Sequence, residues 1–249
     1  MVALDIDAFL ADGFALREHL ETFLKLPPGE LEPRMAAATD ALAQLQPAAL
    51  DDSGCERFYE SDVGTGHLYE LAGWHLQSAD YIADTLRVQS TAAHGDHLDF
   101  GGGIGSHALA AAVLPQVRRV WMVDLNGTNR EFVAWRARRL GLEDRVICCR
   151  DLDDGQLPQR FDSITCLDVL EHVPDPAGLL AQLADRLSPG GGVALLNWYF
   201  FKGFQGEYPF HIDDPNLVQR FFEVLQDRLL ERFHPYLITA RTYILRSQG

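Results

Sequence analysis

A glycine-rich turn that follows a short apolar stretch is the part of this 249-residue sequence best suited to bind a ligand. Asp99 stands near the end of the apolar stretch, and Gly101, Gly103 and Gly105 follow it at alternate positions, before the small residues 108–112. Glycines let the backbone approach a ligand closely, because they have no Cβ atom that would intrude. The turn therefore predicts a binding site for a ligand with a flat or anionic edge.

A second acidic residue follows the next apolar stretch. Residues 120–123 read as a buried strand, and Asp124 comes directly after it. In a strand–helix–strand unit, an acid at the tip of the second strand faces the ligand crevice and can accept hydrogen bonds from both hydroxyls of a ribose. The glycine turn and Asp124 together indicate a cofactor that contains a nucleoside.

The spacing of the glycines narrows the choice of cofactor. A dinucleotide fingerprint reads Gly-x-Gly-x-x-Gly, whereas Gly105 here follows Gly103 after a single residue. No Gly-Lys-Ser/Thr follows, which excludes a phosphate-binding P-loop. An acid followed by Gly-x-Gly-x-Gly resembles motif I of the class I S-adenosylmethionine-dependent methyltransferases that act on small molecules. The resemblance implies S-adenosylmethionine as cofactor, with its methionine ammonium near Asp99, and an NAD-dependent oxidoreductase is disfavoured.

Further segments match the same family in the expected order. They resemble its third strand, its adenine contact, its fourth strand, and the turn into its fifth strand: residues 145–149, 150–152, 161–168 and 187–196. Together with the glycine turn these segments make five ordered matches, which are more specific than one glycine loop. The resemblance implies these cofactor-binding residues: Asp99, Gly101, Gly103, Gly105, Asp124, Leu125, Asp151, Leu152 and Leu167.

Histidines supply the candidate bases for methyl transfer. The mechanism implied by the resemblance is in-line displacement at an activated sulfonium, so the protein has to align donor and acceptor and, for a hydroxyl acceptor, remove a proton. His172 follows the fourth strand and His211 lies in a later aromatic segment, and both are candidate catalytic residues. Their presence favours O-methylation over N- or C-methylation. A protein that binds the cofactor without catalysis is the alternative of a different class.

A metal site is a further hypothesis for the same residues. Asp168, Glu171 and His172, joined by the distant His211, resemble the metal-binding cluster of ubiquinone-pathway O-methyltransferases and small-RNA 2′-O-methyltransferases. In those families Glu is usual where Asp168 stands here. The resemblance implies that Mg²⁺ or Mn²⁺ would orient neighbouring oxygens and lower the pKa of a hydroxyl. The other interpretation is that Glu171 and His172 are structural residues that line the pocket.

Aromatic residues on both sides of the glycine turn predict the acceptor pocket. A helix expected over residues 67–89 carries Tyr69 and Trp74, and the segment 197–215 is rich in aromatic residues and glycine. The pocket residues that we expect are Tyr69, Trp74, Trp198, Tyr199 and Phe204. They favour a small apolar or aromatic acceptor, although aromatic residues on a helix also pack against a sheet without any ligand.

The elements that position these residues predict an α/β fold. We expect a Rossmann-like, seven-stranded, mostly parallel sheet with helices on both faces and a helical N-terminal cap. Residues 1–94 form the expected cap and residues 95–249 the methyltransferase domain, with a pocket insertion at 197–215. Within the cap, helices are expected over 5–24, 32–45 and 67–89, and a loop over 51–66. After a helix from Asp214 to about residue 229, the closing strands are expected at 232–236 and 239–245.

Composition excludes several other classes of protein. The net charge of −15 makes nucleic acid an unlikely partner, because such binding depends on clustered Lys and Arg. We interpret Arg136, Arg138 and Arg139 as the solvated face of a helix, and we expect His107 to face solvent. Cys148 and Cys149 are adjacent and form neither a zinc spacing nor a disulfide framework.

The start of the chain shows no targeting signal. Asp5 and Asp7 interrupt any basic start, and the sequence has no long uncharged apolar span. We therefore expect a cytoplasmic protein without a membrane partner. Its expected partner is a small-molecule acceptor, and a homodimer is left open.

Overall fold

A single twisted sheet of seven strands organises the protein. The computed structural model describes residues 12–45, 52–201, 211–212, 214–233 and 240–246. The strand order is β3-β2-β1-β4-β5-β7-β6; β1 to β5 run parallel, and β7 pairs antiparallel with both β5 and β6. The strands are β1 (Gly95–Phe100), β2 (Val117–Val123), β3 (Val146–Cys149), β4 (Ser163–Cys166), β5 (Val193–Leu196), β6 (Leu229–Arg232) and β7 (Arg241–Leu245). The predicted seven-stranded, mostly parallel sheet is confirmed.

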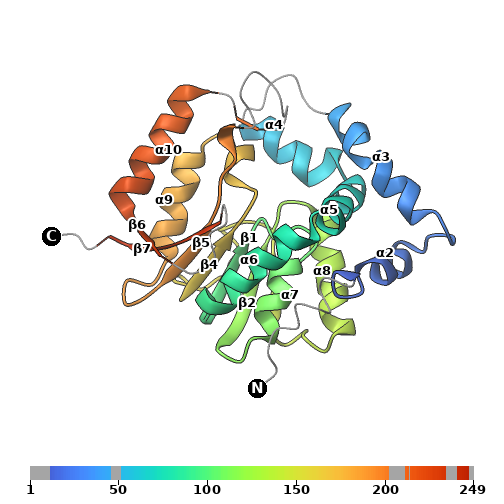
Figure 1. Ribbon diagram of the computed structural model, residues 1–249, viewed down its shortest axis with the longest axis horizontal. Coiled ribbons are helices and arrows are strands. Elements are labelled where there is room, and N and C mark those ends of the chain that lie inside the picture. Colours follow the sequence, from blue (N-terminus) through green and yellow to red (C-terminus); the bar gives the residue numbers. More distant parts are fainter. Residues whose placement is uncertain (1–11, 46–51, 202–210, 213, 234–239, 247–249) are drawn as a thin grey trace.

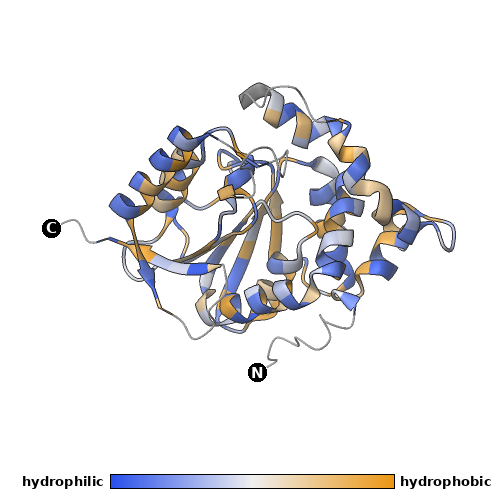
Figure 2. Cartoon of the chain, turned by 45° about the horizontal axis from the view of Figure 1, so that its top comes forward, coloured by the Kyte–Doolittle hydropathy of each residue, from blue (hydrophilic) through white to orange (hydrophobic). Residues whose placement is uncertain are grey.

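Helices cover both faces of the sheet (Figure 1). Because side chains alternate along a strand, Trp121 packs on one face with residues of α9 (Pro176–Arg186) and α10 (Pro215–Arg228). Met122 packs on the other face with residues of α7 (Ser106–Val113) and α8 (Gly127–Arg139). These helices carry both hydrophilic and hydrophobic residues, as expected for helices with one side on a core (Figure 2).

The N-terminal segment is helical, as predicted, but its divisions differ from the prediction. It contains α2 (Leu16–Leu24), α3 (Leu31–Ala43), α4 (Asp52–Arg57), the π-helix η1 (Phe58–Asp62), α5 (Gly66–Gln77) and α6 (Ala79–Ala92). The expected loop at 51–66 is wrong, because most of it is helical. The expected single helix at 67–89 is also wrong, because the helical backbone stops at Ser78 and starts again.

Two predictions about solvent exposure are wrong. Arg136 is fully buried: its guanidinium donates to the carbonyl oxygens of Gly13, Phe14 and Ile104. His107 is buried as well, with Nε2 2.8 Å from the hydroxyl of Thr85. Both side chains join the N-terminal helices to the glycine turn and its helix, which periodicity alone does not reveal.

The end of the chain also departs from the prediction in one element. Asp214 caps α10 and accepts a hydrogen bond from the Asn216 amide, as its position predicts. The strand expected at 232–236 instead begins at Leu229, directly after α10, and ends at Arg232. Among the described residues, no helix is both long enough and apolar enough to cross a membrane.

Candidate cofactor and acceptor site

The glycine turn lies between β1 and α7, at the carboxyl end of the sheet. Gly101 and Gly103 have φ angles of +72° and +53°, which residues other than glycine rarely adopt. A Cβ atom at Gly101 would also clash with Val169, and one at Gly103 would lie 2.9 Å from a methyl carbon of Leu71. Glycine is thus needed at these positions for the backbone conformation of the turn, and also because it leaves room for a ligand.

Asp124 holds the turn in place from the end of β2. Its Oδ2 accepts from the Gly103 amide at 2.8 Å, and its Oδ1 accepts from the Asn126 amide at 2.8 Å. Burial raises the pKa of Asp124 to about 6, although these amide hydrogen bonds oppose the shift. The Asn129 side chain also donates to Oδ1, at 3.3 Å, so one of the roughly four acceptor positions of the carboxylate remains for a ribose hydroxyl. The structure is compatible with the ribose contact predicted for this residue.

A small cavity lies against the turn and contains an unsatisfied carboxylate. The cavity has a volume of about 50 Å³, and Asp99, Gly101, Gly103 and Leu167 are among its walls. Asp99 is 2% exposed, and its Oδ2 has no hydrogen-bond partner among the described residues. Burial, and then the charge of Asp124, raises the pKa of Asp99 to about 7. A buried acceptor without a donor is costly, so the site fits a ligand that brings a donor or a positive charge.

Helix α5 closes the cavity from the N-terminal side. Its residues Leu71, Trp74 and His75 form part of the wall. The Nδ1 atom of His75 lies 3.0 Å from the Ser106 hydroxyl, and burial lowers the pKa of His75 to about 3, so its ring is neutral. Trp74, which we expect in the acceptor pocket, thus lies at the cavity beside the glycine turn. Tyr69 does not line this cavity; its hydroxyl accepts from Arg34 within the cap.

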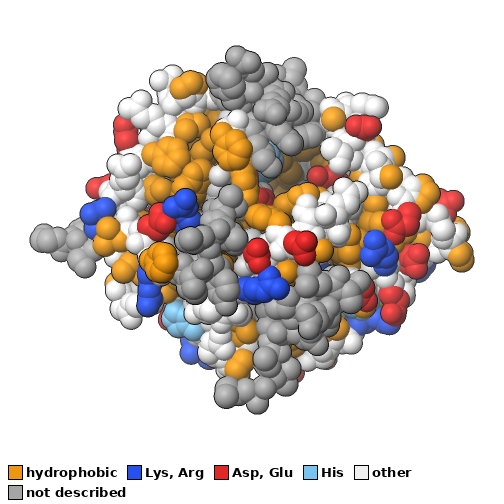
Figure 3. Space-filling model, viewed as in Figure 1, with side chains coloured by type: hydrophobic (Ala, Val, Ile, Leu, Met, Phe, Trp, Pro, Cys, Tyr) orange, Lys and Arg blue, Asp and Glu red, His pale blue; other side chains and the backbone are white. Residues whose placement is uncertain are grey.

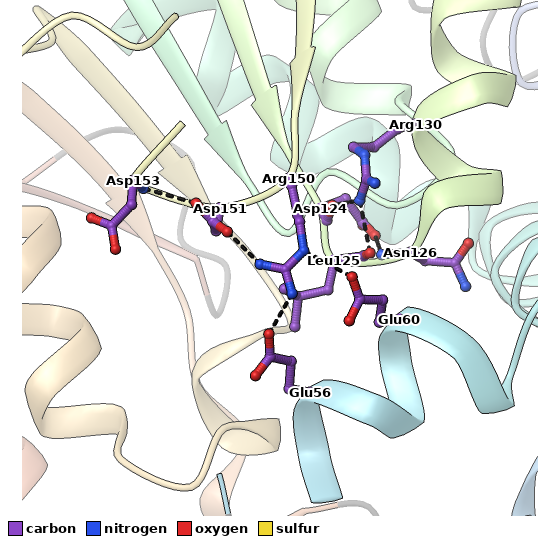
Figure 4. A network of polar contacts seen from close by, with 9 residues as sticks. All are labelled: Glu56, Glu60, Asp124, Leu125, Asn126, Arg130, Arg150, Asp151 and Asp153. Carbon is purple, nitrogen blue, oxygen red and sulfur yellow. Dashed lines mark hydrogen bonds and ion pairs between the residues drawn. The ribbon is translucent and has the colours of Figure 1, made fainter. Parts of the chain in front are cut away.

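A second network lies where the resemblance implies the adenine contact (Figure 4). Arg150 donates to Glu60 at 2.8 Å, to Asp151 at 2.5 Å, and to Glu56. Hydrogen bonds to Glu60 first, and then to Glu56 and Asp151, raise the pKa of Arg150. The network joins α4 and η1 to the loop after β3, where Asp151 lies.

Neighbouring contacts fix the rest of this edge. Arg130 donates to the carbonyl oxygens of Asp124 and Leu125, at 2.6 and 2.7 Å (Figure 4), and Leu152 is buried. The predicted cofactor-binding residues after β2 and after β3 therefore lie in segments that hydrogen bonds hold in place. Sequence reasoning missed two partners of Arg150, Glu56 and Glu60, because a loop was expected where α4 and η1 stand.

Three of the four predicted metal ligands come together after β4. One ligand atom each of Glu171, His172 and His211 lies within 4.8 Å of the others, and the two imidazole rings are 4.6 Å apart and nearly perpendicular. The Nδ1 atom of His211 lies 3.0 Å from the Tyr199 carbonyl oxygen. Asp168 does not belong to this group, so its predicted part in a four-residue cluster is wrong. Its carboxylate instead accepts from Asn197 and Tyr81.

The aromatic residues predicted in the segment 197–215 lie on different sides of the chain. Trp198 packs against Phe221 and Phe222 of α10 and lines a separate groove of about 320 Å³. Figure 3 shows hydrophobic side chains gathered on that side of the molecule. Tyr199 points to the other side, with its hydroxyl donating to that of Tyr81 at 3.1 Å. Trp198 is therefore not a wall of the cofactor cavity, and Phe204 lies outside the described residues.

Tyr59 on the π-helix is a half-buried residue whose ring lies against those of Phe58 and His67. Burial raises the pKa of its phenol, and the charges of Cys55, Glu70 and Glu171 add to this, so the hydroxyl remains protonated. Burial also raises the pKa of Glu70 to about 7.

Comparisons with known proteins find methyltransferases. A family model described as a methyltransferase domain matches residues 74–231. Ubiquinone biosynthesis O-methyltransferases from Methylococcus capsulatus and Idiomarina loihiensis are 36% identical over 120 residues and 34% identical over 93 residues. The matched regions cover 45% and 36% of this chain and 49% and 38% of those proteins, so the chain spans half or less of their length.

Solved structures show the same fold at low sequence identity. An O-methyltransferase family protein from Burkholderia thailandensis has a TM-score of 0.55 and 16% identity, and the match covers 94% of this chain and 72% of that chain. The N-methyltransferase NodS from Bradyrhizobium japonicum has a TM-score of 0.51 and 14% identity, covering 68% of this chain and 97% of that chain. At this identity the likeness is one of fold alone.

Proposed function

Because the chain belongs to the methyltransferase domain family and is an S-adenosylmethionine-dependent methyltransferase, we propose that its acceptor is a hydroxyl group on a small apolar or aromatic molecule. The observation that carries this proposal is the group of Glu171, His172 and His211 next to the carboxyl end of β4. It places two imidazoles and a carboxylate at the end of the sheet where ligands of this fold bind.

The cofactor fits the residues around the glycine turn. The turn leaves room for a ligand, Asp124 is available for a ribose, and the unpartnered oxygen of Asp99 calls for a donor. When bound, S-adenosylmethionine supplies a methyl group on a positively charged sulfur. The chain then has two tasks, which are to align the acceptor and to take up the proton of its hydroxyl.

His172 and His211 are the proposed groups for that proton. Both are half-buried, and their rings lie edge to face against each other. An imidazole is a suitable base near neutral pH. The apolar walls near the turn, which include Leu71, Trp74 and Phe100, support an apolar or aromatic acceptor. The relatives named as O-methyltransferases support oxygen as the attacking atom.

The same three side chains also suit a divalent cation. Two imidazole nitrogens and one carboxylate oxygen within 4.8 Å of one another are a plausible ligand set. Imidazole ligands make Mn²⁺ a better fit than Mg²⁺, which prefers oxygen. A bound cation would lower the pKa of an acceptor hydroxyl. Metal binding at Glu171, His172 and His211 is therefore the second candidate property of this site.

The test is methyl transfer by the purified protein to matched acceptors. We expect transfer to a catechol or another phenol, a product methylated on oxygen by mass spectrometry, and no transfer to the corresponding aniline. In His211→Gln, turnover should fall by about 100-fold, a typical contribution of a general base, while the affinity for S-adenosylhomocysteine is unchanged. His94→Gln is the control, because His94 precedes β1 at the opposite end of the sheet.

The outcomes separate the alternatives. Transfer only to amines or to carbon would contradict the proposal of O-methylation. Cofactor binding without transfer to any acceptor would favour a non-catalytic binding protein. Loss of turnover in EDTA that Mn²⁺ restores would assign the three residues to a metal, whereas full turnover in EDTA would leave the histidines as bases.

A further inference from the structure

One segment of the N-terminal helices crosses the end of the sheet where we place the cofactor. We call residues 55–67 the strap; they comprise the end of α4, η1 and the start of α5. At one end of the strap, the thiol of Cys55 lies 3.6 Å from the carbonyl oxygen of His172, which follows β4. At the other end, Nδ1 of His67 lies 3.1 Å from the side-chain nitrogen of Asn129, in the first turn of α8. The strap therefore reaches from the carboxyl end of β4 to the helix that follows β2.

Between these ends, two carboxylates of the strap bind one arginine (Figure 4). Glu60 accepts from Nε of Arg150 at 2.8 Å, and Glu56 accepts from another nitrogen of the same guanidinium. Arg150 directly follows β3 and precedes Asp151, for which the resemblance implies the adenine contact. The three paired side chains are from 36% to 50% exposed. The strap is thus fastened beside the expected adenine site by ion pairs that solvent and salt can reach.

The strap shares little apolar core with the sheet. Its buried apolar residues Phe58 and Val63 pack with Leu42 of α3, in a small cluster within the cap. Among the described residues, the apolar clusters that contain the strands include no residue of the strap. Segments with few buried apolar contacts to their surroundings open at a low cost in free energy. The strap can therefore detach while the sheet and its helices stay folded.

The position of the strap decides how much room the nucleoside has. The cavity at the glycine turn measures about 50 Å³, whereas sites for small molecules usually measure roughly 300 Å³ or more. Neither Asp124 nor Asp151, the expected ribose and adenine contacts, is among its walls. The strap also shares partners with the ribose carboxylate: Asn129 donates to Asp124 as well as approaching the strap, and Asn126 donates to the carbonyl oxygen of Gly64 at 3.2 Å. A nucleoside at this edge of the sheet therefore requires the strap to move.

We propose that the strap is a gate for the cofactor, and that Arg150 with Glu56 and Glu60 is its latch. The cofactor enters and leaves when the ion pairs of the latch break and the strap lifts, and the strap closes again over the bound nucleoside. The inference rests on S-adenosylmethionine as cofactor and not on the acceptor proposed above. It is therefore tested with S-adenosylhomocysteine and no acceptor, and a wrong acceptor would leave the result unchanged.

The test removes the charges that the strap contributes to the latch. In Glu56→Gln/Glu60→Gln, both side chains keep their length. Stopped-flow measurements should show the association and dissociation rate constants of S-adenosylhomocysteine each raised by about fivefold, because exposed ion pairs contribute little each and the strap opens more often without them. The equilibrium affinity should change by less than about twofold, because both rates rise together. Added NaCl should speed dissociation from the wild type, since salt screens exposed pairs, and should have much less effect on the variant.

Cys55 gives a measure of strap opening that needs no ligand. Its side chain is 5% exposed, so a thiol reagent reaches it when the strap lifts. Alkylation by iodoacetamide, followed by mass spectrometry, should be about fivefold faster at Cys55 in the latch variant than in the wild type, by the same shift in strap opening. It should be slower when S-adenosylhomocysteine is bound. Cys166 in β4 is fully buried and reports unfolding of the whole domain, so its alkylation should not change.

The matched control is Glu30→Gln/Glu32→Gln, because these exposed acids form their ion pairs within the cap. It should behave as the wild type in both measurements. Unchanged ligand rates and unchanged alkylation of Cys55 in the latch variant would overturn the proposal. A lower affinity at an unchanged dissociation rate would overturn it as well, because the two acids would then assist binding without gating release. Faster alkylation of Cys166 together with Cys55 would also count against a gate, because the whole domain would then be destabilised.

Discussion

At the scale of single residues, the sequence indicated which residues lie near the glycine turn, but only part of what their side chains contact. Asp99, Asp124 and the glycines lie together, because motif spacing fixes which residues follow the ends of parallel strands. The family resemblance, and not spacing, grouped Glu171 and His172 with the distant His211, and the structure has ligand atoms of these three residues within 4.8 Å of one another. Sequence spacing gave no information on the direction of the Asp168 side chain, whose carboxylate accepts from Asn197 and Tyr81. Direction depends on partners that are distant in sequence.

A pH dependence of cofactor affinity follows from Asp99. Its pKa is raised to about 7 by burial first and then by Asp124, so most of it is protonated at pH 6 and ionised at pH 8. Only the ionised form attracts a cation. We therefore expect the affinity for S-adenosylhomocysteine to rise by about tenfold from pH 6 to pH 8, since one group with a pKa near 7 titrates in this range. Calorimetry at constant ionic strength measures this.

The control for this prediction is Asp99→Asn, which keeps the shape of the side chain and removes its titration. Its affinity should be lower at pH 8 and vary little above pH 6.5. Below that pH, Asp124 adds a further loss, because its pKa is raised to about 6. A wild-type affinity that does not change between pH 6.5 and pH 8 would show that Asp99 does not contact a positive group.

At the scale of elements, periodicity predicted the strands and most helices, and it failed where polar residues are buried. The strands of the sheet are short apolar runs, which the sequence makes visible. The helices α4 and η1 are held by contacts such as that between Arg150 and Glu60, which a local pattern does not contain. Similarly, the sequence predicts Arg136 as a surface residue of α8, because its carbonyl partners Gly13 and Phe14 are distant in sequence.

Arg136 is expected to stabilise the attachment of the N-terminal helices. In Arg136→Met the carbonyl oxygens of Gly13, Phe14 and Ile104 lose their donor in a buried place. We expect the free energy of unfolding to fall by about 3 kcal/mol, since each buried acceptor left without a partner costs about 1 to 3 kcal/mol and relaxation recovers part of it. Urea denaturation measures the change. Arg138→Met, at an exposed position of the same helix, should change it by less than about 0.5 kcal/mol.

At the scale of the whole molecule, buried histidines and buried acids have opposite effects on how the stability depends on pH. Burial lowers the pKa of five histidines to about 3 or 4: His19, His67, His75, His97 and His107. Their stabilising effect is present above pH 6.5 and is lost as the pH falls. Burial raises the pKa of three acids to about 6 or 7: Glu70, Asp99 and Asp124. Their stabilising effect is present at low pH and is lost as the pH rises through 6 to 7.

The balance predicts a stability maximum near pH 6.5 for the protein without ligand. Below this pH the histidines outnumber the acids, so the melting temperature should fall as the pH decreases. Above it the three acids still release protons in the folded protein, so a smaller fall should be complete by about pH 8. Thermal unfolding in buffers of equal ionic strength measures the profile. A melting temperature that keeps rising to pH 8 would contradict the assignment of these buried groups.

The unsatisfied oxygen of Asp99 has a consequence for how this protein survives in a cell. Because this carboxyl group is buried and poorly solvated, the protein without cofactor is less stable than the protein with it. A ligand that binds the folded protein at Asp99 raises the free energy of unfolding by mass action. Chains that carry their coenzyme should therefore outlast empty ones when proteases compete for unfolded material. The cofactor should therefore slow the digestion of the protein by an added protease.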